Sequence, residues 1–277
     1  MILDDTHEGG NGMTGRKIAD FEDVEIAGRP VEILRRGAGR PLLYLHAGDG
    51  VEPSIPFLDR LSQAFRVIAP SHPGFGASPL SGLRDVDDLA YHYLDLIDAL
   101  KLERPLVVGT SFGGWIAAEI AIRAPERLGA LVLIDAVGIK TGSPEQRTIA
   151  DIFSLTPDAV KDLSYKRPQP ASPPADLDAA RRIAANQEAL SRYAWSPTLH
   201  NPRLRRWLHR ISVPTLILWG ADDRIVAPDY GRAYADAIPG ATFKLITDAG
   251  HFAEREQTEA TAQAILAFAG TNTAAAA

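Results

Sequence analysis

The chain of 277 residues contains no cysteine, and this absence removes several kinds of chemistry at once. Disulfide bonds, thiolate nucleophiles, zinc–thiolate sites and iron–sulfur clusters all need cysteine ligands or partners. A chain that forms no disulfide suits a reducing compartment, so we expect a cytoplasmic location.

Long apolar runs and an excess of basic residues are missing as well. No uncharged apolar segment approaches the roughly 18 residues of a membrane span, and the acidic, glycine-rich first residues lack the apolar centre of a signal peptide. The 29 Lys and Arg residues are outnumbered by 35 Asp and Glu residues, which gives a net charge of −6. Such a chain has no electrostatic affinity for a phosphate backbone, so we expect neither a nucleic-acid nor a membrane partner.

Short apolar segments alternate with longer amphipathic ones along most of the chain. This alternation predicts an α/β fold with a mostly parallel sheet and helices on both faces. Segments rich in Val, Ile and Leu predict buried strands at 41–46, 65–69, 106–109, 128–134, 215–219 and 242–246. Helical patterns occur at 86–100, 114–124, 229–237 and 256–268, and residues 25–36 are a candidate for an additional N-terminal hairpin strand.

The alternation is interrupted between residues 138 and 210. No core strand is predicted there, and helical patterns occur instead at 144–153, 157–163, 177–191 and 202–209. The segment is too long for a loop. We therefore predict a helical cap at 138–210, inserted into a core of residues 18–137 and 211–270, with flexible ends at 1–17 and 271–277.

The strongest local motif is Gly109-Thr110-Ser111-Phe112-Gly113. It lies where a predicted strand ends and a predicted helix begins, which is the setting of a nucleophile elbow. Small residues on both sides allow a sharp turn that lifts the serine hydroxyl above the sheet. On its own the pentapeptide is equally compatible with an ordinary glycine-rich turn.

Two further segments supply the partners that a serine nucleophile needs. A serine hydroxyl becomes reactive only when a base takes its proton and an acid orients that base. Asp222 and Asp223 follow the predicted strand 215–219, and His251 follows the next strand. The order Ser, Asp, His along the chain predicts a triad with Ser111 as nucleophile and His251 as base.

Together these motifs resemble the α/β-hydrolase superfamily over about residues 21–268. The matching motifs are Leu43–Gly48, similar to the His-Gly oxyanion loop; Pro73–Ser78, similar to the Gly-x-Gly-x-Ser turn; the Ser111 elbow; the acid turn Gly220–Asp223; and Gly250-His251. The resemblance implies the α/β-hydrolase fold with a helical cap inserted after the sixth strand. By the family spacing from Gly220 the acid is Asp223, with Asp222 and Asp135 as alternatives.

The resemblance also implies an oxyanion hole. One donor is the backbone N–H of Phe112, the residue after the nucleophile, and the second comes from the loop after His46, at Gly48. Here the chain departs from the family, because Ala47 replaces the usual glycine and a carboxylate follows at Asp49. A carboxylate beside an oxyanion site is unfavourable unless it points away.

The activity implied by the resemblance is that of a carboxylesterase-like serine hydrolase. Such an enzyme cleaves esters of small molecules through an acyl-enzyme intermediate and requires no metal or organic cofactor. Candidate substrate-binding residues lie in the cap, although aromatic side chains at helical spacing more often pack in a core. These candidates are Phe153, Tyr193, Trp195 and His200.

Three alternatives stay open at this stage. Carbon–carbon bond hydrolases of ring-cleavage products share the Ser–Asp–His set and the cap, but many carry Trp after the catalytic histidine, where this chain has Phe252. Lactone hydrolysis uses the same groups. Some relatives instead act as small-molecule receptors with slow or no turnover. The natural substrate and the oligomeric state, a homodimer included, are not determined by the sequence.

Overall fold

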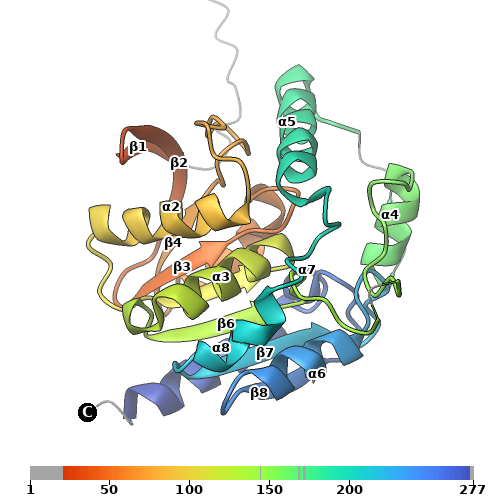
Figure 1. Ribbon diagram of the computed structural model, residues 1–277. Coiled ribbons are helices and arrows are strands. Elements are labelled where there is room, and N and C mark those ends of the chain that lie inside the picture. The colour runs from red at the N-terminus through yellow and green to blue at the C-terminus, as the bar shows by residue number, and fades with distance from the viewer. Residues whose placement is uncertain (1–20, 144, 168, 171–172, 275–277) are drawn as a thin grey trace, which may run out of the picture.

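The computed structural model describes residues 21–274 apart from 144, 168 and 171–172, so the predicted tail at 1–17 lies outside the described residues. An eight-stranded sheet in the order β1-β2-β4-β3-β5-β6-β7-β8 forms the centre of the molecule (Figure 1). The N-terminal hairpin pairs antiparallel with β4, and the six other strands are parallel. The strands are β1 (Phe21–Ile26), β2 (Arg29–Arg36), β3 (Pro41–Leu45), β4 (Arg66–Pro70), β5 (Leu106–Thr110), β6 (Ala130–Ile134), β7 (Thr215–Gly220) and β8 (Thr242–Ile246).

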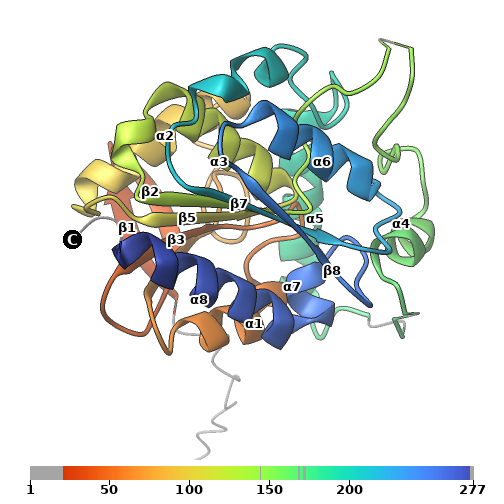
Figure 2. The same ribbon diagram turned by 90° about the horizontal axis from the view of Figure 1, so that it is seen from below.

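Helices cover both faces of the sheet, as Figure 2 shows from below. One face carries α2 (Val86–Ala99), α3 (Phe112–Arg123) and α6 (Pro228–Ala237), and the other carries α1 (Ile55–Leu61), α7 (Ala253–Glu256) and α8 (Thr258–Ala274). Alternate side chains of each strand enter the two resulting cores. Leu43 and Leu45 pack toward α3, while Leu42 and Tyr44 pack toward α1 and α8. Burial on both faces explains the nearly continuous apolar strands, and the predicted α/β-hydrolase fold class is confirmed.

The segment between β6 and β7 holds α4 (Pro157–Ser164), α5 (Leu177–Ala194) and the 3₁₀ helix η3 (Leu204–Arg210). In Figure 1, α5 and α4 stand beyond the sheet rather than on one of its faces. Both helices have N-terminal caps, because the side chains of Thr156 and Asp176 accept backbone N–H groups in the first turn. No helix within the described part of the chain is long and apolar enough to span a bilayer.

The helix predicted at 144–153 is wrong for the residues that the structure describes, 145–153. Ile149, Ile152 and Phe153 have helical spacing, but the backbone of the segment does not form helical hydrogen bonds. The N–H of Ala150 donates to the carbonyl oxygen of Ile225 at 2.9 Å, which ties the segment to the loop after β7, and the N–H of Ile152 donates to the carbonyl oxygen of Ala150, two residues before it. At the other end, α8 continues to Ala274, past the predicted core boundary at residue 270.

A close backbone approach at the end of β7 gives a test of this packing. A Cβ atom on Gly220 would collide with the carbonyl oxygens of Gly250 and Ala249, which are backbone atoms and have little freedom to move. We expect Gly220→Ala to lower the free energy of unfolding by about 3 kcal/mol. Gly270→Ala in α8 is the control, because its Cβ would meet nothing within 4 Å. Chemical denaturation that gives equal stabilities for both variants would contradict this packing.

Candidate active site

Ser111 lies on a strained turn between β5 and α3. Its backbone angles are φ 51° and ψ −114°, a conformation that residues with side chains rarely adopt. The turn is tight enough to require glycine on both sides, because a Cβ on Gly109 would meet the carbonyl oxygen of Gly113 and a Cβ on Gly113 would meet that of Leu45. The result is a serine held at the start of α3, with 9% of its surface exposed.

Two hydrogen bonds join the predicted triad residues. The ring of His251 lies with Nε2 2.8 Å from Oγ of Ser111 and with Nδ1 2.8 Å from Oδ2 of Asp223. The other carboxylate oxygen of Asp223 accepts the backbone N–H groups of Ile225 and Val226 at 2.8 and 2.9 Å. Because Asp223 accepts the Nδ1 proton, Nε2 is free to accept the proton of the serine hydroxyl. This arrangement can activate Ser111 as a nucleophile.

The two competing carboxylates are directed elsewhere. Asp222 pairs at the surface with Nζ of Lys166 at 2.9 Å. Asp135 is buried and accepts the N–H groups of Gly220 at 2.7 Å and Ala253 at 3.2 Å, so it joins the acid turn to α7. Burial, together with the nearby charge of Asp223, raises the pKa of Asp135 well above its usual value. The structure thus brings Asp223 to the histidine, whereas Asp135 braces the turn beneath it.

The two backbone N–H groups predicted to form the oxyanion hole, those of Phe112 and Gly48, are both unpaired among the described residues. The peptide that carries the Gly48 N–H is fixed through its own carbonyl, that of Ala47, which accepts Nδ1–H of His46 at 2.6 Å and N–H of Gly50 at 3.2 Å. Because N–H and C=O point in opposite directions in a trans peptide, these contacts aim the Gly48 donor away from the loop interior.

A buried histidine pair fixes this loop further. The rings of His46 and His72 stack with centroids 3.6 Å apart. The N–H of His72 donates to Nε2 of His46 at 2.9 Å, and Nε2–H of His72 donates to the carbonyl oxygen of His46 at 2.9 Å. Burial lowers the pKa of His46 to about 4 and that of His72 well below its usual value. Both rings are therefore neutral at pH 7.

Asp49 is turned toward α7, where Arg255 binds it. Nη1 and Nη2 of Arg255 lie 2.6 and 2.8 Å from Oδ2 and Oδ1 of Asp49. The carboxylate that looked unfavourable beside the oxyanion site is thus neutralised by a bidentate ion pair. The sequence offered no sign of this pairing, because Arg255 is 206 positions away along the chain.

The four predicted cap residues fall into two groups. Tyr193 packs on Phe112, with ring centroids 6.2 Å apart, and its hydroxyl donates to the carbonyl oxygen of Pro73 at 3.1 Å. Phe153 and Trp195 pack on each other at 5.3 Å, and Trp195 is 59% exposed. His200 makes its ring hydrogen bond within the cap, to the carbonyl oxygen of Thr198 at 2.8 Å. The structure therefore brings only Tyr193 of the four into contact with the elbow.

Leu190 is a site neighbour that the sequence analysis missed. Its side chain occupies the space that a Cβ on Gly48 would need, so it lies directly against the oxyanion loop. It precedes Tyr193 by three residues on α5 and therefore shares a helix face with it. That spacing is the signal that could have identified it.

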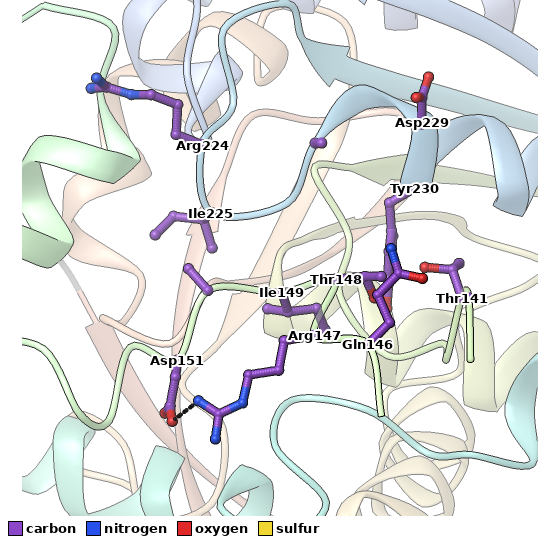
Figure 3. A pocket seen from close by; sticks show the side chains of 13 residues that line it. Thr141, Gln146, Arg147, Thr148, Ile149, Asp151, Arg224, Ile225, Asp229 and Tyr230 are labelled. Atoms are coloured by element: carbon purple, nitrogen blue, oxygen red, sulfur yellow. Dashed lines mark hydrogen bonds and ion pairs between the residues drawn. The ribbon is translucent and has the colours of Figure 1, made fainter. Parts of the chain in front are cut away.

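A cavity of about 630 Å³ lies apart from these groups (Figure 3). It is lined by residues 141–142 and 146–151 of the inserted segment, by the loop that follows Asp223 and by the start of α6. Figure 3 shows the ion pair between Arg147 and Asp151 at its edge, at 2.8 Å. None of the triad or oxyanion residues lines it, so we assign it no part in the chemistry.

Residues 42–264 match the alpha/beta hydrolase family, and the chain belongs to this family. It is 29% identical over 255 residues to a 2-hydroxymuconate semialdehyde hydrolase of Pseudomonas sp. (strain CF600), covering 84% of this chain and 88% of that one. A meta-cleavage product hydrolase, CumD, is similar in structure, with a TM-score of 0.74, 25% identity, and coverage of 90% and 98%. A thermophilic esterase from Thermogutta terrifontis has a TM-score of 0.73, 25% identity, and coverage of 92% and 99%.

The assignment of the acid can be tested directly. Replacing Asp223 with Asn leaves the shape of the turn but removes the charge that holds the imidazole, so we expect kcat to fall by about 10⁴. Asp222→Asn removes only a surface ion pair, and we expect kcat to stay within about twofold of wild type. Steady-state kinetics in which Asp222→Asn is the damaging change would refute the assignment of Asp223.

The buried neutral histidines predict how stability depends on pH. His92 on α2 is also buried, neither of its ring nitrogens has a partner among the described residues, and burial lowers its pKa to about 4. Because the unfolded chain binds protons at a pKa of about 6.5, the stability present above that pH is lost as the pH falls toward 4.

Replacing His92 with Leu removes one of these groups. We expect the decline in unfolding free energy between pH 6 and pH 5 to be shallower in His92→Leu by up to about 1.4 kcal/mol per pH unit. His209→Gln, at an exposed position of η3, is the control. Equal slopes for wild type and His92→Leu in denaturation at several pH values would be the contrary result.

Proposed function

We propose that the chain is a serine hydrolase that cleaves the carbon–carbon bond next to a ketone in a conjugated 2-hydroxy-6-oxo acid. The observation that carries its hydrolytic part is the hydrogen-bonded chain from Ser111 through His251 to Asp223, with both links at 2.8 Å. The substrate class is supported by relatives of similar length that are named for such compounds, among them the 2-hydroxymuconate semialdehyde hydrolase.

In the proposed reaction Ser111 Oγ attacks the ketone carbon while Nε2 of His251 takes the hydroxyl proton. The oxygen that becomes negative lies between the N–H groups of Phe112 and Gly48, and Asp223 stabilises the imidazolium. The substrate reacts as its 2-keto tautomer, in which the proton of the 2-hydroxyl group has moved to the carbon next to the ketone. The carbon–carbon bond then breaks, its electron pair passes through the conjugated fragment to the 2-oxygen, and this dienolate oxygen receives the proton from His251. Water, deprotonated by His251, hydrolyses the acyl-enzyme and releases the carboxylic acid and the free serine.

The conjugated acid is required by the chemistry of the leaving group. An ordinary carbon leaving group cannot hold an electron pair, whereas a carbon conjugated to the 2-keto form of the acid shares it with that oxygen as a dienolate. The triad and the N–H pair need no change for this purpose, because the first step is the same attack on a carbonyl carbon that ester hydrolysis begins with.

Hydrolysis of carboxylic esters is the second candidate. It is favoured by the similarity to the Thermogutta terrifontis esterase, of which the chain covers 99%. The residue after His251 also differs from the Trp that many ring-cleavage hydrolases carry. Phe252 packs under the guanidinium of Arg255, 3.9 Å from the ring centre, and against the ring of Tyr165.

Turnover of both substrate classes separates the candidates. We expect kcat/KM for 2-hydroxymuconate semialdehyde to exceed that for p-nitrophenyl butyrate by about tenfold or more, because only a matched substrate uses its binding energy in the transition state. Both activities should vanish in Ser111→Ala and persist in Ser62→Ala, which removes an exposed hydroxyl at the end of α1. Rapid ester hydrolysis without cleavage of the dienoate would establish the esterase candidate instead.

A further inference from the structure

Arg255 is a buried cation between two parts of the candidate site. Arg255 lies in α7, four residues after His251 along the chain, and 8% of its side chain is exposed. Its guanidinium lies over the ring of Phe252, whose other contacts include the ring of His251 at 5.1 Å. Nε donates to Glu254 at 3.1 Å, and Nη1 also reaches the hydroxyl of Tyr165 at 3.3 Å. These contacts attach the guanidinium to the segment that carries His251.

On its other side Arg255 binds the oxyanion loop. Both terminal nitrogens bind the carboxylate of Asp49, at 2.6 and 2.8 Å, and Asp49 directly follows Gly48. A bidentate pair fixes orientation as well as distance, which a single contact does not. Burial lowers the pKa of Arg255, but the charge of Asp49, the hydrogen bonds to it and the charge of Glu254 together outweigh burial and raise that pKa. The pKa of Asp49 is lowered although burial acts against this, because the charge and hydrogen bonds of Arg255 favour the carboxylate, so both partners are charged at pH 7.

The same cluster reaches the strand that carries the nucleophile. Glu254 accepts the hydroxyl proton of Ser54 at 3.2 Å. The hydroxyl oxygen of Tyr44 lies within hydrogen-bond distance of two others, 3.0 Å from Oγ of Ser54 and 3.2 Å from Oγ1 of Thr110. Thr110 is the last residue of β5, immediately before Ser111. One chain of polar contacts thus connects the three segments that supply nucleophile, base and oxyanion donor.

We propose that Arg255 is a positioning residue for the reaction: through Asp49 it holds the Gly48 N–H in place relative to the turn that carries His251. It contacts neither substrate nor reacting atoms. The inference rests on the part of the proposed function that makes Ser111 the nucleophile, but not on the identity of the substrate. Without the pair, residues 48–50 lose the side-chain anchor to α7 that Asp49 provides. The contacts of the Ala47 carbonyl still orient the Gly48 N–H within its own loop, but the donor is no longer held relative to His251.

The test is the rate constant with which a fluorophosphonate probe modifies Ser111, followed by intact mass. This reaction forms a tetrahedral adduct and needs both the histidine and the oxyanion donors. An irreversibly misfolded fraction reduces the amplitude of labelling, not its rate constant, and a denaturation curve for each variant shows that the remaining protein is folded under the assay conditions. A purely structural role would then leave the rate constant unchanged. Turnover of p-nitrophenyl butyrate per labelled site gives kcat and KM separately.

We expect Arg255→Gln and Asp49→Asn each to slow labelling by about tenfold or more, less than the full loss of an oxyanion donor. kcat should fall with KM nearly unchanged, because the lost interaction acts in the transition state. The double variant should be no slower than the slower single variant, since both remove one contact. Arg255→Lys keeps the charge without the bidentate geometry, so its labelling rate constant should lie between those of wild type and Arg255→Gln.

Arg60→Gln is the matched control. Arg60 also forms a bidentate pair, with Nε and Nη2 at 2.7 and 3.0 Å from the carboxylate oxygens of Glu259, but this pair joins α1 to α8, away from the loops that carry the site. Its labelling rate should stay within about twofold of wild type. Wild-type rate constants in both Arg255→Gln and Asp49→Asn would overturn the proposal.

The two proposals fail in different ways. If wild type is labelled but does not cleave 2-hydroxymuconate semialdehyde, the proposed substrate class is refuted, while Arg255 is still judged by the labelling rates. If the probe modifies wild type at a residue other than Ser111, the nucleophile assignment fails, and the positioning role is overturned with it.

Discussion

The hydrogen bond from Ser111 to Nε2 of His251 joins residues 140 positions apart, and much of the surrounding structure holds its two ends at 2.8 Å. The serine end is set by the strained turn after β5, which only glycine neighbours allow. The histidine end is set by backbone contacts: its own N–H donates to the carbonyl oxygen of Ser164 at 2.7 Å, and Glu256 accepts the N–H of Gly250 at 2.7 Å. A strained nucleophile persists because its neighbours leave it no alternative.

Buried polar groups, rather than apolar packing alone, determine how the site segments meet. Asp135 accepts backbone N–H groups from the acid turn and from α7, and the histidine pair fixes the oxyanion loop. Burying each of these groups is unfavourable in free energy, and its hydrogen bonds offset that cost only when its partners are in place. The arrangement is therefore specific: a shift in one loop leaves a buried donor or acceptor without its partner in another.

The cap contributes to the same arrangement. Asn186 of α5 donates to the carbonyl oxygen of Asp49 at 2.8 Å and accepts the N–H of Gly76 at 2.9 Å, so it bridges two core loops. Arg182, one turn earlier, pairs with Glu32 at 3.1 Å and with Glu52. The cap helix thus lies on the oxyanion loop through polar contacts as well as through Leu190.

The sequence predicted most of the framework because the relevant signals are local. Apolar runs located the six parallel strands to within about two residues, and the resemblance to the α/β-hydrolase family favoured Asp223 among three candidate carboxylates. What it could not supply depends on contacts between distant loops. Asp49 contacts Arg255 only in the folded chain, and the helical spacing at Ile149 and Phe153 was overridden by the hydrogen bond from this segment to Ile225.

Among the cap candidates, aromatic character favoured Trp195, whereas position on α5 decided that Tyr193 and Leu190 lie at the elbow.

The most direct measurement is a crystal structure of the protein after reaction with a fluorophosphonate. The account predicts a phosphorus–oxygen bond to Oγ of Ser111, with the phosphonyl oxygen about 3 Å from the nitrogens of both Phe112 and Gly48. An adduct on another residue, or a phosphonyl oxygen directed away from Gly48, would contradict it.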